Sequence, residues 1–204
     1  MAVVEISNLK IKLGNRIVID DFSATLSTGT ITAVIGPNGI GKSSLIAAIA
    51  GDLPFVAGDI KIKGVGVNSL SLKEAAEIRS VVLQNRNYWL GYSVREVISM
   101  GQEPVANSRI NQIIDQLDMV EFADQSVTTL SGGQAQRVEI ARALIRDTDV
   151  YLLDEPLSAQ DRNSRDRIIR ILQEMRAAGK TILIIAHSEM SGLDWCDQII
   201  DLGS

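Results

Sequence analysis

The stretch Gly36-Pro37-Asn38-Gly39-Ile40-Gly41-Lys42-Ser43 decides how the rest of the chain is organised. It matches the pattern G-x-x-x-x-G-K-[ST], in which glycines let the backbone curl so that successive N–H groups point at phosphate oxygens. The apolar run at 31–35 predicts a buried strand before it, and residues 44–50 predict a short apolar helix that Gly51 ends. This order of strand, glycine loop and helix predicts a nucleoside-triphosphate site.

Two side chains of this loop have predicted contacts with a nucleotide. Lys42 is expected to reach the β- and γ-phosphates, and the Ser43 hydroxyl is expected to ligate Mg²⁺. The simpler alternative is a glycine-rich turn that binds nothing, and the flanking strand and helix argue against it.

Composition and charge exclude several classes of function. With 204 residues, 46% of them hydrophobic and 22% charged, the chain fits one domain with a full hydrophobic core. A net charge of −5 without a compensating cluster of Lys and Arg argues against nucleic acid as a partner. Cys196 is the only cysteine, which excludes a disulfide framework and a cysteine-based metal site.

No segment is predicted to enter a membrane. Uninterrupted apolar runs stay well short of the roughly 18 residues that a spanning helix needs, and Glu5 falls where a signal peptide would be apolar. We therefore expect a cytoplasmic protein with no direct membrane insertion, which acts at a membrane only by docking on another protein.

The pattern before residue 85 predicts mostly short strands. They are expected at 3–6, 17–19, 22–26, 31–35, 58–62 and 81–83, with breaks at Gly14-Asn15 and at 27–29. A helix is expected at 71–79, because Ser71 followed by Glu74 forms a capping box. Gln84 ends the last of these strands with a polar side chain.

Residues 85–129 change to a helical pattern and predict a helical insertion. Helices are expected at 94–100, 108–117, 134–145 and 161–178, and strands at 150–154, 181–186 and 198–202. The apolar runs at 150–153 and 181–186 lie on either side of a helix, which predicts parallel strands buried on both faces.

Two carboxylates follow the apolar run at 150–153. Asp154 and Glu155 come at the C-terminal end of a predicted strand, where α/β sheets bind their ligands. Asp154 is expected to hold Mg²⁺, and Glu155 to accept a proton from the water that attacks the γ-phosphate. Solvated charges at a strand end are the alternative, which a phosphate loop in the same chain disfavours.

The segment Leu130-Ser131-Gly132-Gly133-Gln134 opens a predicted helix. Ser131 can cap that helix, and the two glycines let backbone amides approach an anion closely. Alone, this is a weak signal for a second anion-binding site.

Together these motifs resemble those of ATP-binding-cassette ATPases, the motor subunits of ABC transporters, over nearly the whole chain. The resemblance rests on the Walker A loop at 36–43, the Q-loop glutamine at Gln84, the signature at 130–134, Walker B at 150–155, the D-loop Ser158-Ala159-Gln160-Asp161 and the switch histidine at His187.

The resemblance implies a head-to-tail dimer. The loop at 36–43 of one subunit would hold ATP, and Ser131, Gly132 and Gly133 of a second copy would cap it. Glu155, His187 and Lys42 would be catalytic, and Ser43, Gln84 and Asp154 would hold Mg²⁺. The implied ATP contacts are Gly36, Pro37, Asn38, Gly39, Ile40, Gly41, Lys42, Ser43, Ser44, Gln84, Ser131, Gly132, Gly133, Gln134 and Asp161.

The implied fold is α/β: a P-loop NTPase core with a parallel sheet, an N-terminal antiparallel β subdomain and a small helical insertion. Residues 1–204 would form one nucleotide-binding domain, with its core at 1–84 and 130–204 and a helical subdomain at about 85–129. Asp161 is also a predicted cap for the helix that follows it.

Two positions depart from the family pattern. The family usually has an aromatic residue on which adenine stacks. In this chain the corresponding position falls near Leu13, and no aromatic residue occurs between Met1 and Phe22. Adenine is therefore expected to meet an aliphatic surface. Gln160 stands where the D-loop commonly has leucine.

Several functions remain open for a cassette of this kind. The resemblance implies a motor for separate membrane permease subunits, peripheral on the inner face of the cell membrane. Residues 74–104 resemble importer ATPases for iron-siderophore, haem or cobalamin uptake. An exporter ATPase, a non-transport cassette and an inactive binding module are the alternatives, whereas the absence of an N-K-x-D motif excludes a GTPase.

Three aromatic residues crowd into five positions just after Gln84. Tyr88, Trp89 and Tyr92 are interpreted as part of the surface that receives the permease, since bunched Tyr and Trp are typical of binding surfaces. The alternative, expected for one of the three, is an anchor between the helical insertion and the core.

Overall fold

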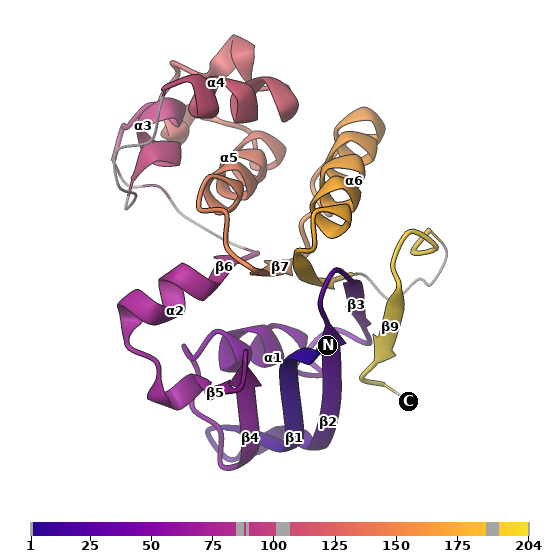
Figure 1. Cartoon of the computed structure of the whole chain (residues 1–204). Coiled ribbons are helices and arrows are strands. Elements are labelled where there is room, and N and C mark those ends of the chain that lie inside the picture. Colours follow the sequence, from indigo (N-terminus) through magenta and orange to yellow (C-terminus); the bar gives the residue numbers. More distant parts are fainter. Residues whose placement is uncertain (1, 85–87, 89, 101–106, 187–191, 204) are drawn as a thin grey trace.

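The computed structural model describes residues 2–84, 88, 90–100, 107–186 and 192–203. Within this part of the chain, a five-stranded parallel sheet separates a group of helices from a four-stranded antiparallel sheet (Figure 1). None of the helices in the described residues is long and apolar enough to cross a membrane. The predicted α/β fold is confirmed.

The parallel sheet is built from the apolar runs that the sequence marks. Its strand order is β6 (Arg79–Val82), β7 (Val150–Asp154), β8 (Thr181–Ile185), β3 (Ile31–Ile35) and β9 (Gln198–Asp201). Every residue of β3, β7 and β8 is buried, which explains why these strands are apolar except at Thr32, Asp154 and Thr181. β8 therefore lies between β3, which leads into the loop at 36–43, and β7, which ends at Asp154.

The antiparallel sheet has longer strands than the sequence predicted. β1 (Ala2–Leu13) and β2 (Arg16–Ser27) form one hairpin, followed in the sheet by β4 (Ala57–Ile62) and β5 (Val65–Gly66). The strands expected at 3–6, 17–19 and 22–26 are confirmed as parts of β1 and β2, but their bounds were too short, and 17–19 and 22–26 belong to one strand. Register shifts interrupt the alternation of apolar residues along this hairpin without breaking its pairing.

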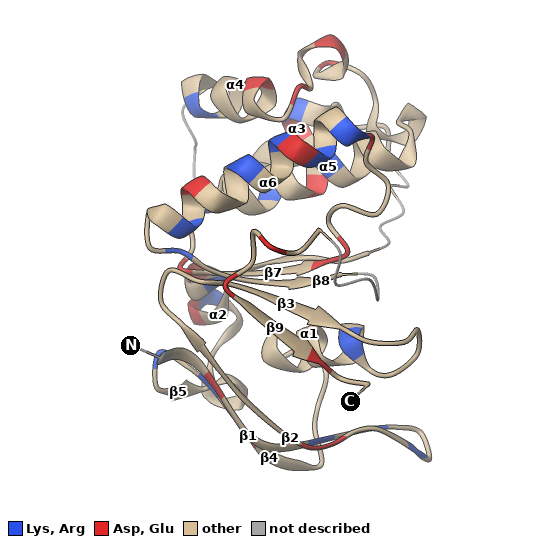
Figure 2. Ribbon diagram, turned by 90° about the vertical axis from the view of Figure 1, so that its right-hand side faces the viewer, with Lys and Arg blue, Asp and Glu red and all other residues tan. Residues whose placement is uncertain are grey.

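The two faces of the parallel sheet carry separate hydrophobic clusters. Ile182 and Ile184 of β8 pack into one cluster, and Leu183 and Ile185 pack into the other. The first cluster includes the long helices α5 (Gly132–Leu144) and α6 (Arg162–Ala177). Figure 2 shows these helices on one side of the parallel strands, with the antiparallel sheet on the other.

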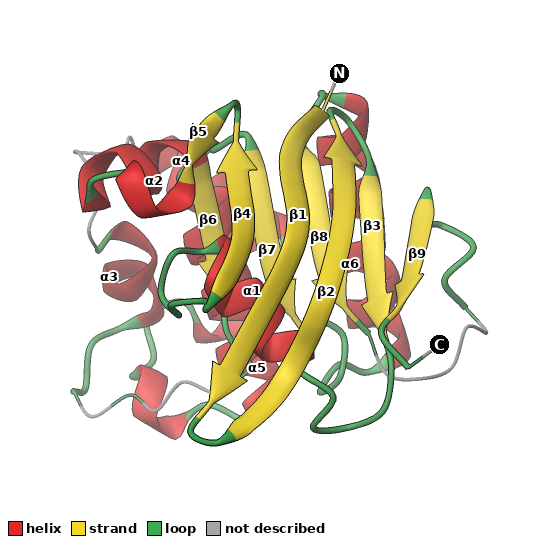
Figure 3. Ribbon diagram, turned by 90° about the horizontal axis from the view of Figure 1, so that it is seen from below, coloured by secondary structure: helices red, strands yellow, loops and turns green. Residues whose placement is uncertain are grey.

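The helix α1 (Lys42–Ile49) lies between the two sheets (Figure 3). Leu45, Ile46 and Ile49 are buried in the second cluster, which fixes the end of the helix that carries Lys42. The predicted stop at Gly51 is confirmed, because this residue has a left-handed backbone with φ of 75°. Burial of α1 between two sheets makes the preceding loop a rigid platform.

The structure describes further helices besides α1, α5 and α6. They are α2 (Leu72–Ile78), α3 (Val94–Ser99), α4 (Asn107–Gln116) and the short 3₁₀ turns Val67–Ser69, Val120–Phe122 and Val127–Thr129. The capping box of Ser71 and Glu74 is confirmed at the start of α2. The helical pattern at 94–100 and 108–117 is confirmed as α3 and α4, which pack on α5. The division into a core and a helical subdomain at 85–129 stays a prediction.

Candidate active site

The glycine loop joins the end of β3 to the start of α1. Gly41 takes φ of 119°, and a Cβ atom there would lie 2.7 Å from the carbonyl oxygen of Val18. Only glycine fits this position. Within the described residues no side chain caps the start of α1 at Gly41, so the first amides of the helix remain available to an anion.

Lys42 is buried, with 6% of its surface exposed, at the first residue of α1. Its Nζ atom donates to the carbonyl oxygen of Gly36 at 2.6 Å and to that of Pro37 at 3.1 Å. These two acceptors compensate the cost of burying an ammonium group. They also hold the positive charge directly over the glycine loop.

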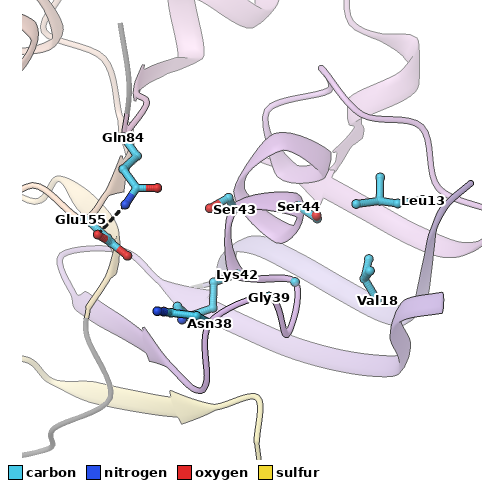
Figure 4. Close-up of a pocket in the computed structure, with 10 residues that line it drawn as sticks. Leu13, Val18, Asn38, Gly39, Lys42, Ser43, Ser44, Gln84 and Glu155 are labelled. Carbon is cyan, nitrogen blue, oxygen red and sulfur yellow. Dashed lines mark hydrogen bonds between the residues drawn. The ribbon is translucent and has the colours of Figure 1, made fainter. Parts of the chain in front are cut away.

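A pocket of about 390 Å³ opens on this loop (Figure 4). Gln84 and Glu155 lie on one side of Lys42 and Ser43, and Leu13 and Val18 lie on the other. The residues that line it are Leu13, Val18, Asn38, Gly39, Gly41, Lys42, Ser43, Ser44, Gln84 and Glu155. The fold thus brings residues predicted from three separate motifs into one cavity.

Glu155 is buried and contacts Gln84 on the same side of the pocket. The Gln84 Nε2 atom donates to Oε2 of Glu155 at 2.7 Å, so the end of β6 contacts the end of β7. Glu155 has a left-handed backbone with φ of 49°, which is rare outside glycine and costs free energy. The chain turns sharply after β7 at this residue.

Asp154 precedes Glu155 and is almost fully buried, with 3% of its surface exposed. Burial raises the pKa of this carboxyl group, the nearby Glu155 adds to the rise, and the Ser43 side chain and Lys42 oppose it. Its Oδ1 atom accepts no hydrogen bond from the part of the chain that the structure describes. A buried carboxylate oxygen without a donor is the kind of atom that binds a cation.

A family model described as ABC transporter matches residues 19–158 of the chain. The chain belongs to the ABC transporter family. It is 31% identical to the petrobactin import ATP-binding protein YclP of Bacillus subtilis, over 98% of this chain and 83% of that protein. The hemin import ATP-binding protein HmuV of Rhodococcus jostii is 32% identical, over 93% of this chain and 68% of its own length.

Solved cassettes have the same fold. The ADP-bound conformation of an ATP-binding cassette from an ABC transporter superposes with a TM-score of 0.81. It is 26% identical in sequence, over 98% of this chain and 87% of the other. Family and fold together make this chain an ATP-binding cassette and an ATPase.

The signature segment of this cassette lies away from the Walker A pocket. Ser131 caps α5 and accepts from the Gln134 amide at 3.3 Å, and the Gln134 Oε1 atom accepts from the Ser131 amide at 2.9 Å. The predicted cap at Ser131 is confirmed. Residues 130–134 do not line the Walker A pocket, although Gly132 and Gln84 share a neighbouring pocket of about 240 Å³.

Asp161 of the D-loop caps α6, as expected. Its carboxylate accepts from the Ser164 amide at 3.0 Å and from the Ser164 hydroxyl at 2.8 Å. These bonds hold the pKa of Asp161 below its usual value. A contact between Asp161 and ATP stays a prediction.

Two predicted residues lie outside the described part of the chain. They are His187, which follows β8 in sequence, and Trp89. Their structural placement is not described, and their roles stay predictions.

Tyr88 fits the anchoring alternative, because it packs on the first hydrophobic cluster and its hydroxyl donates to Glu139 of α5. Tyr92 is 42% exposed.

Sequence reasoning missed Val18 and Gln136. Val18 lines the pocket from β2, and only the pairing of the hairpin places it beside Leu13. Gln136 is a buried polar residue of α5 whose Nε2 atom donates to the Glu155 carbonyl oxygen at 2.6 Å. The sequence feature that could have identified Gln136 is its position two residues after the signature segment at 130–134.

Proposed function

We propose that this cassette hydrolyses MgATP to drive import of an iron chelate or haem through a separate membrane permease. The pocket that joins the Walker A loop to Gln84 and Glu155 carries the proposal for hydrolysis. The petrobactin and hemin import relatives support both the direction of transport and the class of cargo.

The residues around Asp154 suit a hard divalent cation. The buried Asp154 oxygen that accepts no bond from the described residues, the hydroxyl of Ser43 and the amide oxygen of Gln84 form an all-oxygen donor set. We propose that Ser43, Gln84 and Asp154 hold Mg²⁺ together with the nucleotide. Bound there, Mg²⁺ would neutralise charge on the β- and γ-phosphate oxygens.

Glu155 is the proposed general base. Its carboxylate lines the pocket, Gln84 orients one of its oxygens, and an ionised carboxylate can accept a proton from water. Lys42 is proposed to move its ammonium group from the Gly36 and Pro37 carbonyls onto phosphate oxygens. For His187 we propose a contact with the γ-phosphate, on sequence alone.

We also propose that two copies pair head to tail. Ser131 and Gly132 are exposed at the start of α5, and neither lines the Walker A pocket of its own chain. Among the described residues, Gly132 has open space where a Cβ atom would lie, so its amide can approach an anion on another molecule. A second copy would therefore complete each ATP site.

The proposed permease contact lies beside the Q-loop. Leu83, Leu90 and Tyr92 expose 38%, 61% and 42% of their surfaces close to Gln84 in sequence. Exposed apolar and aromatic side chains are common at protein-binding surfaces. Docking there would hold the cassette on the inner face of the cell membrane.

Phosphate release from ATP by the purified chain tests the proposal. We expect hydrolysis in the presence of Mg²⁺ and its loss when EDTA removes the cation. Equal hydrolysis with and without EDTA would contradict the magnesium site. No hydrolysis under either condition would favour an inactive binding module.

Substitution of Leu13 with tyrosine is expected to tighten ATP binding. Leu13 is 43% exposed at the edge of the pocket, and Arg16 of the same hairpin donates to the Gly39 carbonyl oxygen at 3.4 Å. An aromatic ring at this position adds stacking on adenine, which corresponds to about a two- to tenfold gain in affinity.

Titration of ATP and GTP into both proteins measures this gain. We expect wild type to discriminate weakly between the two bases, because an aliphatic surface has no preference in stacking. The neighbouring Lys12 is exposed and does not line the pocket, so Lys12→Tyr is the matched control and should leave both affinities unchanged. Unchanged affinity in Leu13→Tyr would mean that the base binds elsewhere.

A further inference from the structure

Hydrogen bonds from the described residues hold the backbone of Glu155. Its carbonyl oxygen accepts from Gln136 Nε2 at 2.6 Å, from the Ser158 amide at 3.2 Å and from the Ser158 hydroxyl at 3.0 Å. Glu155 has φ of 49°, a conformation that persists in a side-chain-bearing residue only when its surroundings impose it. The direction of its carboxylate therefore depends on these bonds.

Gln136 connects this carbonyl to the start of the signature helix. It lies on α5 with 9% of its surface exposed, so its amide group is removed from water and needs partners inside the protein. Its Nε2 atom bonds to Glu155, and its Oε1 atom accepts from Gln160 Nε2 at 3.1 Å. Both polar atoms of the side chain are thereby engaged.

Gln160 fixes which way the Gln136 amide faces. The Nε2 atom of Gln160 also donates to the carbonyl oxygen of Gly133 at 3.0 Å. An amide nitrogen has two hydrogens, one for each of these acceptors. Because Gln160 donates, Gln136 must present its oxygen to Gln160 and its nitrogen to Glu155.

The D-loop and the signature also touch through their backbones. A Cβ atom at Gly133 would lie 2.5 Å from the carbonyl oxygen of Ala159, so no other residue fits without a shift. Movement at the start of α5 is therefore transmitted to residues 159–160 by direct contact, as well as through the amides of Gln136 and Gln160.

We propose that Gln136 and Gln160 are positioning residues for Glu155, and that they couple its orientation to the start of the signature helix. The inference rests on the proposed function, in which Glu155 is the general base and residues 131–133 contact ATP at the other site of a dimer. Contact at the signature of one chain would then set the base in the same chain's own Walker A pocket. Gln160, which stands where the family commonly has leucine, makes this connection polar in this protein.

Steady-state hydrolysis by Gln136→Leu and Gln160→Leu tests the proposal. Both substitutions keep the approximate size and remove the amide. We expect kcat to fall about tenfold in each, with KM and ATP affinity within about twofold of wild type, because positioning of the base matters mainly in the transition state. The double variant should be no slower than Gln136→Leu, because both substitutions break the same chain of hydrogen bonds to Glu155.

Two further variants separate positioning from packing. Gln160→Glu keeps the size of the side chain, but a carboxylate cannot donate to the Gly133 carbonyl, so we expect the same loss of kcat as in Gln160→Leu. Gln173→Leu, at an exposed position of α6, is the matched control and should leave kcat unchanged. Melting temperatures of all variants identify those that are folded.

Two results would overturn the inference. One is a wild-type kcat in folded Gln136→Leu. The other is a decrease of kcat in the double variant that equals the product of the decreases in the two single variants. If Glu155→Gln itself turned over ATP like wild type, the proposed function would fail as well. Inactive Glu155→Gln beside fully active Gln136→Leu would overturn this inference alone.

Discussion

Glu155→Gln is expected to slow ATP hydrolysis by roughly two to four decades, the range assigned to a positioned general base. Glutamine keeps the size of the side chain and its place opposite Gln84, but an amide does not accept a proton at neutral pH. ATP affinity should stay close to wild type, because an ionised carboxylate provides neither positive charge nor a hydrogen-bond donor for binding the phosphates. The ATP-bound dimer should therefore accumulate.

Phosphate release and size-exclusion chromatography measure these two effects. We expect the Glu155→Gln variant to elute as a dimer with MgATP and as a monomer without nucleotide. Glu121→Gln, at an exposed position far along the chain from Walker B, is the matched control and should behave as wild type in both assays. Turnover of Glu155→Gln close to that of wild type would refute its role as base.

Lys42→Ala is expected to weaken ATP binding by about one to two decades and to remove measurable hydrolysis. The ammonium group lies buried over the glycine loop, where it is held by the carbonyls of Gly36 and Pro37. A charged hydrogen bond of this kind contributes about 1.5–3 kcal/mol, which corresponds to that loss of affinity. Alanine also leaves the two carbonyls facing the negative phosphates.

Isothermal titration with MgATP gives the affinity, and a thermal melt shows whether the variant is folded. Lys73→Ala, whose side chain is 88% exposed on α2, is the matched control for loss of one positive charge. We expect its affinity to equal that of wild type. If Lys42→Ala bound ATP as tightly as Lys73→Ala, the nucleotide phosphates would not lie on the loop at 36–43.

The sequence predicted those parts of the fold that depend on local patterns. The runs at 31–35, 150–154 and 181–185 are mostly apolar because each strand is buried on both faces. Ser71 with Glu74 was recognised as a helix start because a capping box is complete within four residues. Such signals need no knowledge of distant contacts.

Features made by distant contacts were not predicted. The length of β1 and β2 depends on pairing between the strands, and their bulges hide the alternation that marks a strand. The position of β8 between β3 and β7 is a matter of topology, which the motifs do not encode. A reader of the sequence expects Walker A and Walker B in one site without knowing that a strand separates them.

The candidate site divides in the same way. The sequence identified the loop at 36–43, Gln84, Asp154 and Glu155, and the fold gathers them around one pocket or beside it. The bonds of Gln136 to Glu155 and Gln160 escaped notice, because two glutamines 24 residues apart have no local pattern in common.

Turnover per chain as a function of chain concentration, at saturating MgATP, tests most directly whether this is an ATPase with sites shared between two copies. We expect turnover per chain to rise with concentration and then to level off, because each site needs the signature of a second copy. The Glu155→Gln variant should stay at background throughout. Turnover per chain that is constant down to the lowest measurable concentration would contradict the shared site, and the absence of MgATP hydrolysis at every concentration would contradict the ATPase itself.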